Sequence, residues 1–207
     1  MVYPKKAYFK DHVFEVDEHV YEPAEDTFLV AEKLDTKKDD IVLEIGTGCG
    51  ILAILAAKTA KKVVAIDINP YAIECTKRNA KNKNLLKRID FRQGNLFEPI
   101  KHGEQFSLII FNSPYLPSEP DEEKSWIGKA WAGGETGRQV IDPFIASAPD
   151  YLATNGRILL VQSSLSDVKK TIKMFDELNF QAKVVSELKF PFESIGLIEA
   201  KLEVSVF

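Results

Sequence analysis

The stretch Ile41–Gly50 reads IVLEIGTGCG and decides the fold class. It opens with an apolar, β-branched run that is typical of a buried parallel strand, and glycines follow at once. An apolar segment after Gly50 predicts a helix from Ile51 to about Lys58. Glycines are needed where a backbone turns tightly and a ligand approaches it closely, and the start of the helix offers free N–H groups. The sequence therefore predicts strand, glycine turn and helix, the first unit of an α/β fold.

The glycine spacing indicates which ligand the turn binds. It is GxGxG and not the GxGxxG of dinucleotide-binding folds, and the acid Glu44 precedes the first glycine, Gly46, by two residues. A carboxylate at this point would repel a pyrophosphate but attract a ligand that carries an ammonium and a sulfonium group. We therefore expect Glu44, Gly46 and Gly48 to bind S-adenosylmethionine rather than a nicotinamide dinucleotide.

A second strand, Lys62–Asp67, ends in an acid. An acid at the end of the second strand of a Rossmann-like unit accepts hydrogen bonds from both ribose hydroxyls of an adenosine, and Asp67 fits that role. The alternative is that Asp67 caps the next helix, for which Asn69 and Pro70 supply a good N-cap and first position. The order of elements favours the ribose role.

The third predicted strand is Ile89–Gly94, and Asn95 and Leu96 leave its end. In a fold of this class, a polar side chain at this place can bond the adenine amine, and Leu96 or Phe97 can cover the ring. Loop structure alone would explain Asn95 equally well.

A proline-broken loop follows the fourth predicted strand, Phe106–Phe111. Pro114 has no backbone N–H, which leaves the carbonyl of Ser113 free of a continued ladder. The Asn112 side chain adds a second carbonyl acceptor, and together the two could hold both hydrogens of a substrate –NH2 group. The alternative is a turn in which asparagine and proline only change the chain direction.

Periodicity and turn residues predict the remaining elements. Acids in Glu25–Asp26 mark a helix start, and a polar segment after the proline loop indicates a mobile lid. The predicted segments are an N-terminal hairpin or arm within Ala7–Val20, the lid Ser118–Lys129, a helix Arg138–Leu152, a fifth strand Gly156–Val161, a helix from Leu165 to Leu178, and a hairpin of Ala182–Leu188 and Ile195–Val206.

Composition limits the class of protein. The chain has 207 residues, of which 45% are hydrophobic, which suits one domain. A formal net charge of −4 gives no global basic field for nucleic acid. Cys49 and Cys75 show no metal-ligand spacing, so we expect free thiols in a reducing compartment and no metal. Without a signal-like or membrane-spanning apolar run, we expect a cytoplasmic protein.

The motifs together resemble a known family. The glycine turn and Asp67 are similar to those of class I S-adenosylmethionine-dependent methyltransferases, which implies a Rossmann-like α/β fold with a seven-stranded, mostly parallel sheet and a C-terminal antiparallel hairpin. Asn112–Tyr115 resembles the Asn-Pro-Pro-Tyr motif of amino-methyltransferases. With Val20–Leu29 and Ala130–Gly134, the chain resembles the HemK-like protein-glutamine N5-methyltransferases, in particular the short eukaryotic and archaeal branch that methylates the GGQ glutamine of class I release factors.

The resemblance implies roles for particular residues. The cofactor pocket would be lined by Thr27, Glu44, Gly46, Gly48, Asp67, Asn95, Leu96 and Asn112. The substrate would be gripped by Asn112, Ser113, Pro114 and Tyr115. Ser113 stands where the family usually has proline, so its loop is expected to be less stiff.

The resemblance also implies an organisation and a partner. We expect a single methyltransferase domain, residues 1–207, with an arm at 1–20 and the catalytic core at 21–207. The short branch resembles enzymes that work with a small zinc-ribbon activator subunit, which implies a heterodimer. The alternatives are methylation of another amine, namely the exocyclic amine of adenine in DNA or RNA, a protein lysine or a small molecule, and a cofactor-binding regulatory subunit without activity.

Overall fold

The structure, a computed structural model, describes residues 4–202, and the chain divides into two compact units between Lys101 and His102. The strands belong to a seven-stranded, mostly parallel sheet with a C-terminal antiparallel hairpin, and a separate two-stranded sheet lies near the N-terminus. This confirms the predicted fold class.

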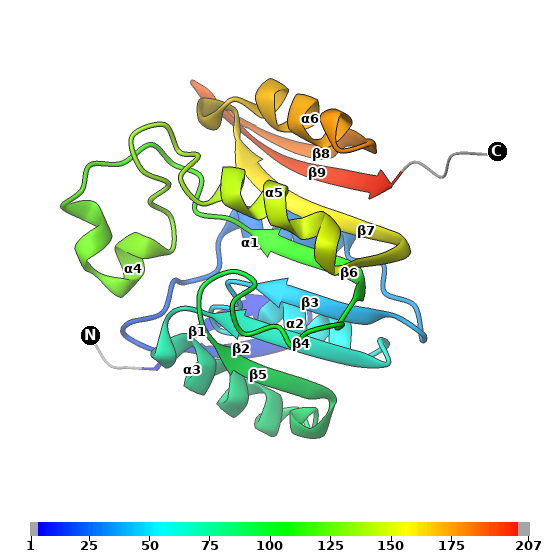
Figure 1. Ribbon diagram of the computed structural model, residues 1–207. Coiled ribbons are helices and arrows are strands. Elements are labelled where there is room, and N and C mark those ends of the chain that lie inside the picture. Colours follow the sequence, from blue (N-terminus) through cyan, green and yellow to red (C-terminus); the bar gives the residue numbers. More distant parts are fainter. Residues whose placement is uncertain (1–3, 203–207) are drawn as a thin grey trace. The chain divides into compact units, whose positions relative to one another are not determined.

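The first unit contains three parallel strands in the order β5-β4-β3 (Figure 1). The three strands are β3 (Ile41–Ile45), β4 (Lys62–Asp67) and β5 (Ile89–Gln93), and the helices that follow the first two are α2 (Ile51–Ala57) and α3 (Pro70–Asn82). A short 3₁₀ helix, Leu86–Arg88, precedes β5. The apolar runs of β3 and β4 are buried, as predicted for strands covered on both faces. Their carboxyl ends carry the predicted ligand-binding residues.

The N-terminal segment of this unit is a hairpin of β1 (Lys5–Phe9) and β2 (His12–Val16), in agreement with the predicted hairpin or arm. Helix α1 (Glu25–Lys33) follows, and its first turn contains Glu25 and Asp26. Negatively charged side chains in the first turn stabilise a helix because they interact favourably with the positive end of its dipole.

The second unit contains four strands in the order β6-β7-β9-β8. Strand β6 (Phe106–Asn112) is parallel to β7 (Leu152–Ser163), whereas β9 (Glu193–Leu202) is antiparallel to β7 and to β8 (Phe180–Phe190). Helix α5 (Ile141–Tyr151) precedes β7, and a 3₁₀ turn, Ser164–Ser166, and helix α6 (Val168–Glu177) lie between β7 and β8. Figure 1 shows α6 alongside β8 and β9.

Between β6 and α5, the chain makes a long excursion that carries a 3₁₀ turn (Glu122–Lys124) and the short helix α4 (Trp126–Lys129) (Figure 1). Backbone hydrogen bonds close its base: Leu116 N–H donates to the Trp131 carbonyl at 3.0 Å, and Gly133 N–H donates to the Leu116 carbonyl at 2.8 Å. The predicted lid is therefore a looped segment with a hydrogen-bonded base. Its mobility stays a prediction.

Several boundaries differ from the predicted ones. Strand β7 begins at Leu152 because this residue pairs with Phe106 before the register shifts to pair Arg157 with Leu108. Helix α5 begins at Ile141 and not at Arg138, whose guanidinium is used in tertiary contacts described below. The last predicted strand residues, 203–206, lie outside the described residues. Within residues 4–202, no helix has the length and apolar character needed to cross a membrane.

Candidate active site

The glycine turn between β3 and α2 has the left-handed backbone that its sequence predicts. Gly48 has φ +56° and Gly50 has φ +87°, a region that glycine enters without the usual steric cost. A Cβ atom on Gly50 would lie 2.5 Å from Cγ2 of Thr76, whereas a Cβ atom on Gly48 would meet no atom within 4 Å. Gly50 is thus required for close packing, and open space adjoins Gly48.

Glu44 is buried at the end of β3, with 2% of its surface exposed. Its Oε2 atom accepts hydrogen bonds from the Thr47 hydroxyl at 2.6 Å and from Ala53 N–H at 3.0 Å. Burial raises the pKa of Glu44 to about 8, against the lowering effect of these two hydrogen bonds and with a further increase from Asp67. The carboxyl group therefore fixes the turn, and its role in binding the cofactor stays a prediction.

Asp67 lies at the end of β4 and bonds directly to the glycine turn. Its Oδ2 atom accepts the N–H of Gly48 at 2.9 Å, and its Oδ1 atom accepts the N–H of Asn69 at 2.9 Å. The cap of α3 is Asn69, whose side chain accepts the N–H of Tyr71, so the capping alternative for Asp67 is not needed. Burial raises the pKa of Asp67 to about 6, although N–H donors that include Gly48 and Asn69 lower it.

The other predicted cofactor residues of this unit lie on separate segments. Thr27 is buried in α1, and both its N–H and its hydroxyl donate to Oδ1 of Asp26. Asn95 is exposed, and its backbone N–H donates to Glu98. Leu96 is half-buried with φ +46°. Hydrogen bonds thus join Glu44, Gly48 and Asp67 through the turn. The cofactor roles of these three residues, and those of Thr27, Asn95 and Leu96, stay predictions.

In the second unit, the four predicted substrate residues leave the end of β6. Asn112 is the last residue of that strand and lies opposite Val161 of β7. Ser113 is buried, and its hydroxyl donates to the Val161 carbonyl at 2.8 Å. This bond ties the loop to β7 at Ser113, the position at which the resemblance described above implies a proline. The loop is therefore held by a different contact from the one a proline would supply.

Tyr115 is also buried, and the backbone of this loop packs tightly on the far end of the excursion. A Cβ atom on Gly137 would lie 2.3 Å from the Tyr115 carbonyl oxygen and 2.8 Å from Cβ of Ser166. We name residues Asn112–Tyr115 the clamp loop. Its conformation is set by contacts with β7 and with the glycine-rich segment around Gly137.

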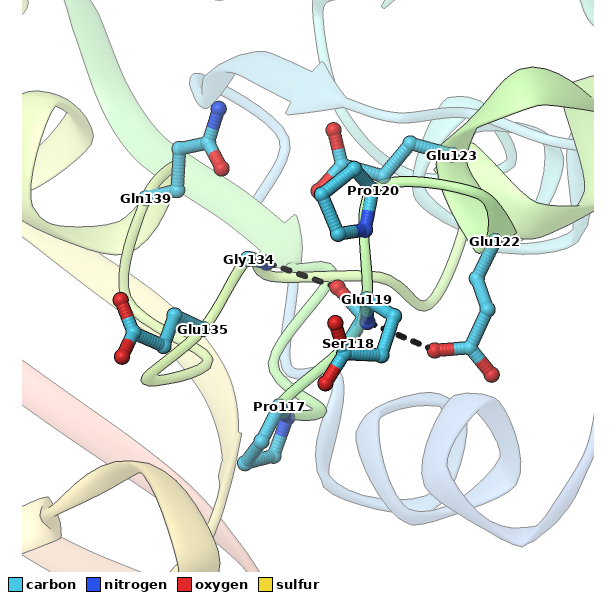
Figure 2. A pocket seen from close by; sticks show the side chains of 9 residues that line it. All are labelled: Pro117, Ser118, Glu119, Pro120, Glu122, Glu123, Gly134, Glu135 and Gln139. Atoms are coloured by element: carbon cyan, nitrogen blue, oxygen red, sulfur yellow. Dashed lines mark hydrogen bonds between the residues drawn. The ribbon is translucent and has the colours of Figure 1, made fainter.

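A pocket of about 610 Å³ is lined by residues that come after the clamp loop in the sequence. Four of its nine lining residues are glutamates and none is basic, and Figure 2 shows the side chains of all nine. Two hydrogen bonds shape its wall, from Gly134 N–H to the Ser118 hydroxyl and from Glu119 N–H to Glu122 (Figure 2). The lining residues are Pro117, Ser118, Glu119, Pro120, Glu122, Glu123, Gly134, Glu135 and Gln139.

Sequence reasoning missed three buried polar side chains that hold these loops. Thr76 donates to the Gly48 carbonyl at 2.9 Å, and Asn79 donates to the Cys49 carbonyl at 2.8 Å. Arg138 is 5% exposed and donates to the carbonyls of Ser166 and Asp167. The available signal was a polar residue on the apolar stripe of a predicted helix. Both thiols, of Cys49 and Cys75, are free and buried, as expected.

Comparison with known proteins identifies the class of protein. Residues 23–127 match the family model described as Methyltransferase small domain, so the chain is a methyltransferase. The chain is 43% identical, over 87% of its length and 91% of the relative, to "Putative protein N5-glutamine methyltransferase MJ0928" of Methanocaldococcus jannaschii. It is 32% identical, over 87% of its length and 88% of the relative, to "Methyltransferase HEMK2" of Homo sapiens. The chain therefore belongs to the HemK-like protein N5-glutamine methyltransferases.

A solved structure shows the same fold. The E. cuniculi Mtq2-Trm112 complex, described as responsible for methylation of the eRF1 translation termination factor, matches with a TM-score of 0.68 at 24% identity. The match covers 89% of this chain and 99% of that chain.

Proposed function

We propose that this chain transfers a methyl group from S-adenosylmethionine to the side-chain amide of a protein glutamine, the GGQ glutamine of a class I release factor. The observation that carries the proposal is the clamp loop, Asn112–Tyr115, at the end of β6 in a member of this family. Relatives named as release factor glutamine methyltransferases, such as the one from Aquifex aeolicus, support the substrate.

The residues of the first unit fit the cofactor. The open space beside Gly48 leaves room for a ligand against the backbone, and the carboxyl groups of Glu44 and Asp67 provide acceptors for its ammonium and ribose hydroxyl groups. Thr27, Asn95 and Leu96 are the other proposed cofactor residues of this unit. Asn112, in the second unit, is proposed to contact the cofactor as well. When bound, S-adenosylmethionine supplies an electrophilic methyl group on a sulfonium centre.

The clamp loop performs the positioning. A glutamine amide nitrogen is a poor nucleophile because its lone pair is delocalised into the carbonyl. The Asn112 side-chain oxygen and the Ser113 backbone carbonyl accept the two amide hydrogens, orient the nitrogen and stabilise the positive charge that develops on it. Tyr115 packs over the amide plane, and Pro114 keeps the Ser113 carbonyl out of a strand ladder. Bound S-adenosylmethionine would supply the methyl group for the new N–C bond, with its sulfur as the leaving group, and the nitrogen would then lose one proton to water.

We propose that residues 1–207 act as one methyltransferase domain, with an arm at 1–20 and the core at 21–207. We also propose a cytoplasmic enzyme that works as a heterodimer with a small zinc-ribbon activator subunit. The description of the E. cuniculi neighbour as a two-protein complex supports a partner.

The main rival is methylation of an adenine amine in DNA or RNA, since the same loop could hold that –NH2 group. The pocket that follows the clamp loop opposes this reading. Its four glutamates and the net charge of −4 would repel a phosphate backbone.

A methylation assay with each substrate in turn distinguishes glutamine methylation from adenine methylation. The chain, with and without a zinc-ribbon subunit, is incubated with labelled S-adenosylmethionine and either a GGQ-bearing release factor or adenine-containing oligonucleotides. Label is expected in the release factor and is expected to disappear when the GGQ glutamine is replaced by asparagine. Label in the oligonucleotides alone would establish the rival.

A further inference from the structure

Asn79 of α3 connects two parts of the first unit that are far apart in the sequence. It is 2% exposed. Its Oδ1 atom accepts the N–H of Glu15 at 2.9 Å, and its Nδ2 atom donates to the Glu15 carbonyl at 2.8 Å and to the Cys49 carbonyl at 2.8 Å. The Asn79 carboxamide therefore bonds to both the N–H and the carbonyl of one residue of β2, as the backbone of a neighbouring strand would. The same carboxamide also bonds to the glycine turn.

Thr76, one helical turn earlier, holds the adjacent peptide of the same turn. It is fully buried, and its hydroxyl donates to the Gly48 carbonyl at 2.9 Å. Its methyl group occupies the space beside Gly50. Because Gly48 N–H donates to Asp67 at the same time, the peptides on both sides of Gly48 are held. Side chains of α3 thus fix two consecutive carbonyls, those of Gly48 and Cys49.

The N-terminal hairpin is tied to the same helix and to the Asp67 loop. Arg78 bonds to the carboxylates of Glu15 and Asp17 at 2.7 and 2.5 Å. Asn69, whose N–H donates to Asp67, also donates from Nδ2 to the His19 carbonyl at 2.7 Å. The hairpin region therefore contacts the residues that hold both proposed cofactor-binding loops.

We propose that Asn79 and Thr76 are positioning residues for the cofactor. The inference rests on the proposed function, in which the glycine turn binds S-adenosylmethionine. Glycines have many accessible backbone states, and the two side chains select one of them. Without these bonds, the turn must be ordered when the ligand binds, and that cost appears as weaker binding.

Calorimetry with S-adenosylhomocysteine tests the proposal in the intact chain. Asn79→Ala and the isosteric Thr76→Val are each expected to raise Kd about tenfold, the scale of one lost buried hydrogen bond. At saturating S-adenosylmethionine, kcat is expected to stay within about threefold, because the clamp loop is untouched. Arg78→Ala is the matched control, since it removes contacts with the hairpin but none with the turn. Its Kd is expected within about threefold of wild type.

Amide hydrogen exchange gives a reading that needs no cofactor. The amides of the glycine turn are expected to exchange faster in Asn79→Ala and Thr76→Val than in wild type or Arg78→Ala. Wild-type affinity and wild-type exchange in Thr76→Val would overturn the positioning role, even if Asn79→Ala failed to fold. An equal loss of affinity in Arg78→Ala would overturn it as well. If wild type bound no S-adenosylhomocysteine at all, the proposed function would itself fail, whereas the exchange comparison, which needs no cofactor, would still test the hold of Asn79 and Thr76 on the turn separately.

Discussion

Glu44 and Thr47 are joined by a hydrogen bond of 2.6 Å, in which the threonine hydroxyl donates to Oε2 of the glutamate. The same oxygen accepts the N–H of Ala53 in the first turns of α2. One buried carboxyl group thus connects the end of β3, the glycine turn and the following helix. Its burial makes it a source of pH-dependent stability.

The free energy of unfolding is predicted to fall as pH rises through this group. Burial raises the pKa of Glu44 from 4.5 to about 8. Between these two values, the folded chain keeps a proton on Glu44 that the unfolded chain has lost. The contribution of Glu44 to the free energy of unfolding is therefore complete below pH 4.5, declines up to about pH 8 and is constant above that. Glu44→Gln removes this component. Asp67, whose pKa is also raised, contributes a decline of the same sign to both proteins.

Urea unfolding across this pH range measures the difference. Wild type is expected to lose stability relative to Glu44→Gln as pH rises, since the contribution of Asp67 largely cancels between them. Parallel stability curves for the two proteins would show that the Glu44 carboxyl group does not titrate as the structure requires.

Alanine at the two glycines is predicted to have different effects. Both positions have positive φ, so each substitution costs about 1–2 kcal/mol of backbone strain. Gly50→Ala costs more because the new methyl group would collide with Thr76, whereas Gly48→Ala has open space. The midpoint temperature of thermal unfolding should therefore be lower for Gly50→Ala than for Gly48→Ala. Calorimetry should show that Gly48→Ala folds but binds S-adenosylhomocysteine weakly, because its methyl group enters the proposed cofactor space. Equal stability of the two variants would contradict this account of the turn.

Arg138 is predicted to be a large contributor to stability of the second unit. It donates to the carbonyls of Ser166 and Asp167 and to the Thr171 hydroxyl, and it pairs with Asp142 at 2.7 Å. Arg138→Ala removes a buried charge and leaves these acceptors without their guanidinium donors. The free energy of unfolding, measured with urea, is expected to fall by about 3 kcal/mol.

Arg138→Lys is the control for charge. It keeps the positive charge but cannot reproduce the planar set of donors, so an intermediate loss is expected. A loss below about 0.5 kcal/mol for Arg138→Ala, the range of ordinary surface changes, would show that the buried network is not needed.

The first unit shows how far local sequence carries the fold. The predicted strands Ile41–Ile45 and Lys62–Asp67 coincide with β3 and β4, because apolar β-branched runs bounded by glycines or an acid have few other solutions. The glycine turn and the acids Glu44 and Asp67 were predicted on the same basis, and the structure joins them by hydrogen bonds.

What local sequence could not show depends on contacts between distant residues. Asn79 bonds to Glu15, 64 residues away, and Arg138 bonds to Ser166, 28 residues away. A polar residue on the apolar stripe of a predicted helix is a hint of burial, but it does not indicate the distant partner. The start of β7 was missed for a similar reason, because the pairing of Leu152 with Phe106 across a register shift has no local signal.

The central claim is that the clamp loop activates a glutamine amide, and the single-turnover rate of Asn112→Ala tests it most directly. Wild type and variant are saturated with S-adenosylmethionine and mixed with a GGQ-bearing release factor, and the methylated glutamine is followed by mass spectrometry. The account predicts a rate about 10²–10³-fold lower in the variant, by analogy with loss of one group that stabilises transition-state charge. Methylation of the same glutamine at the wild-type rate would contradict it.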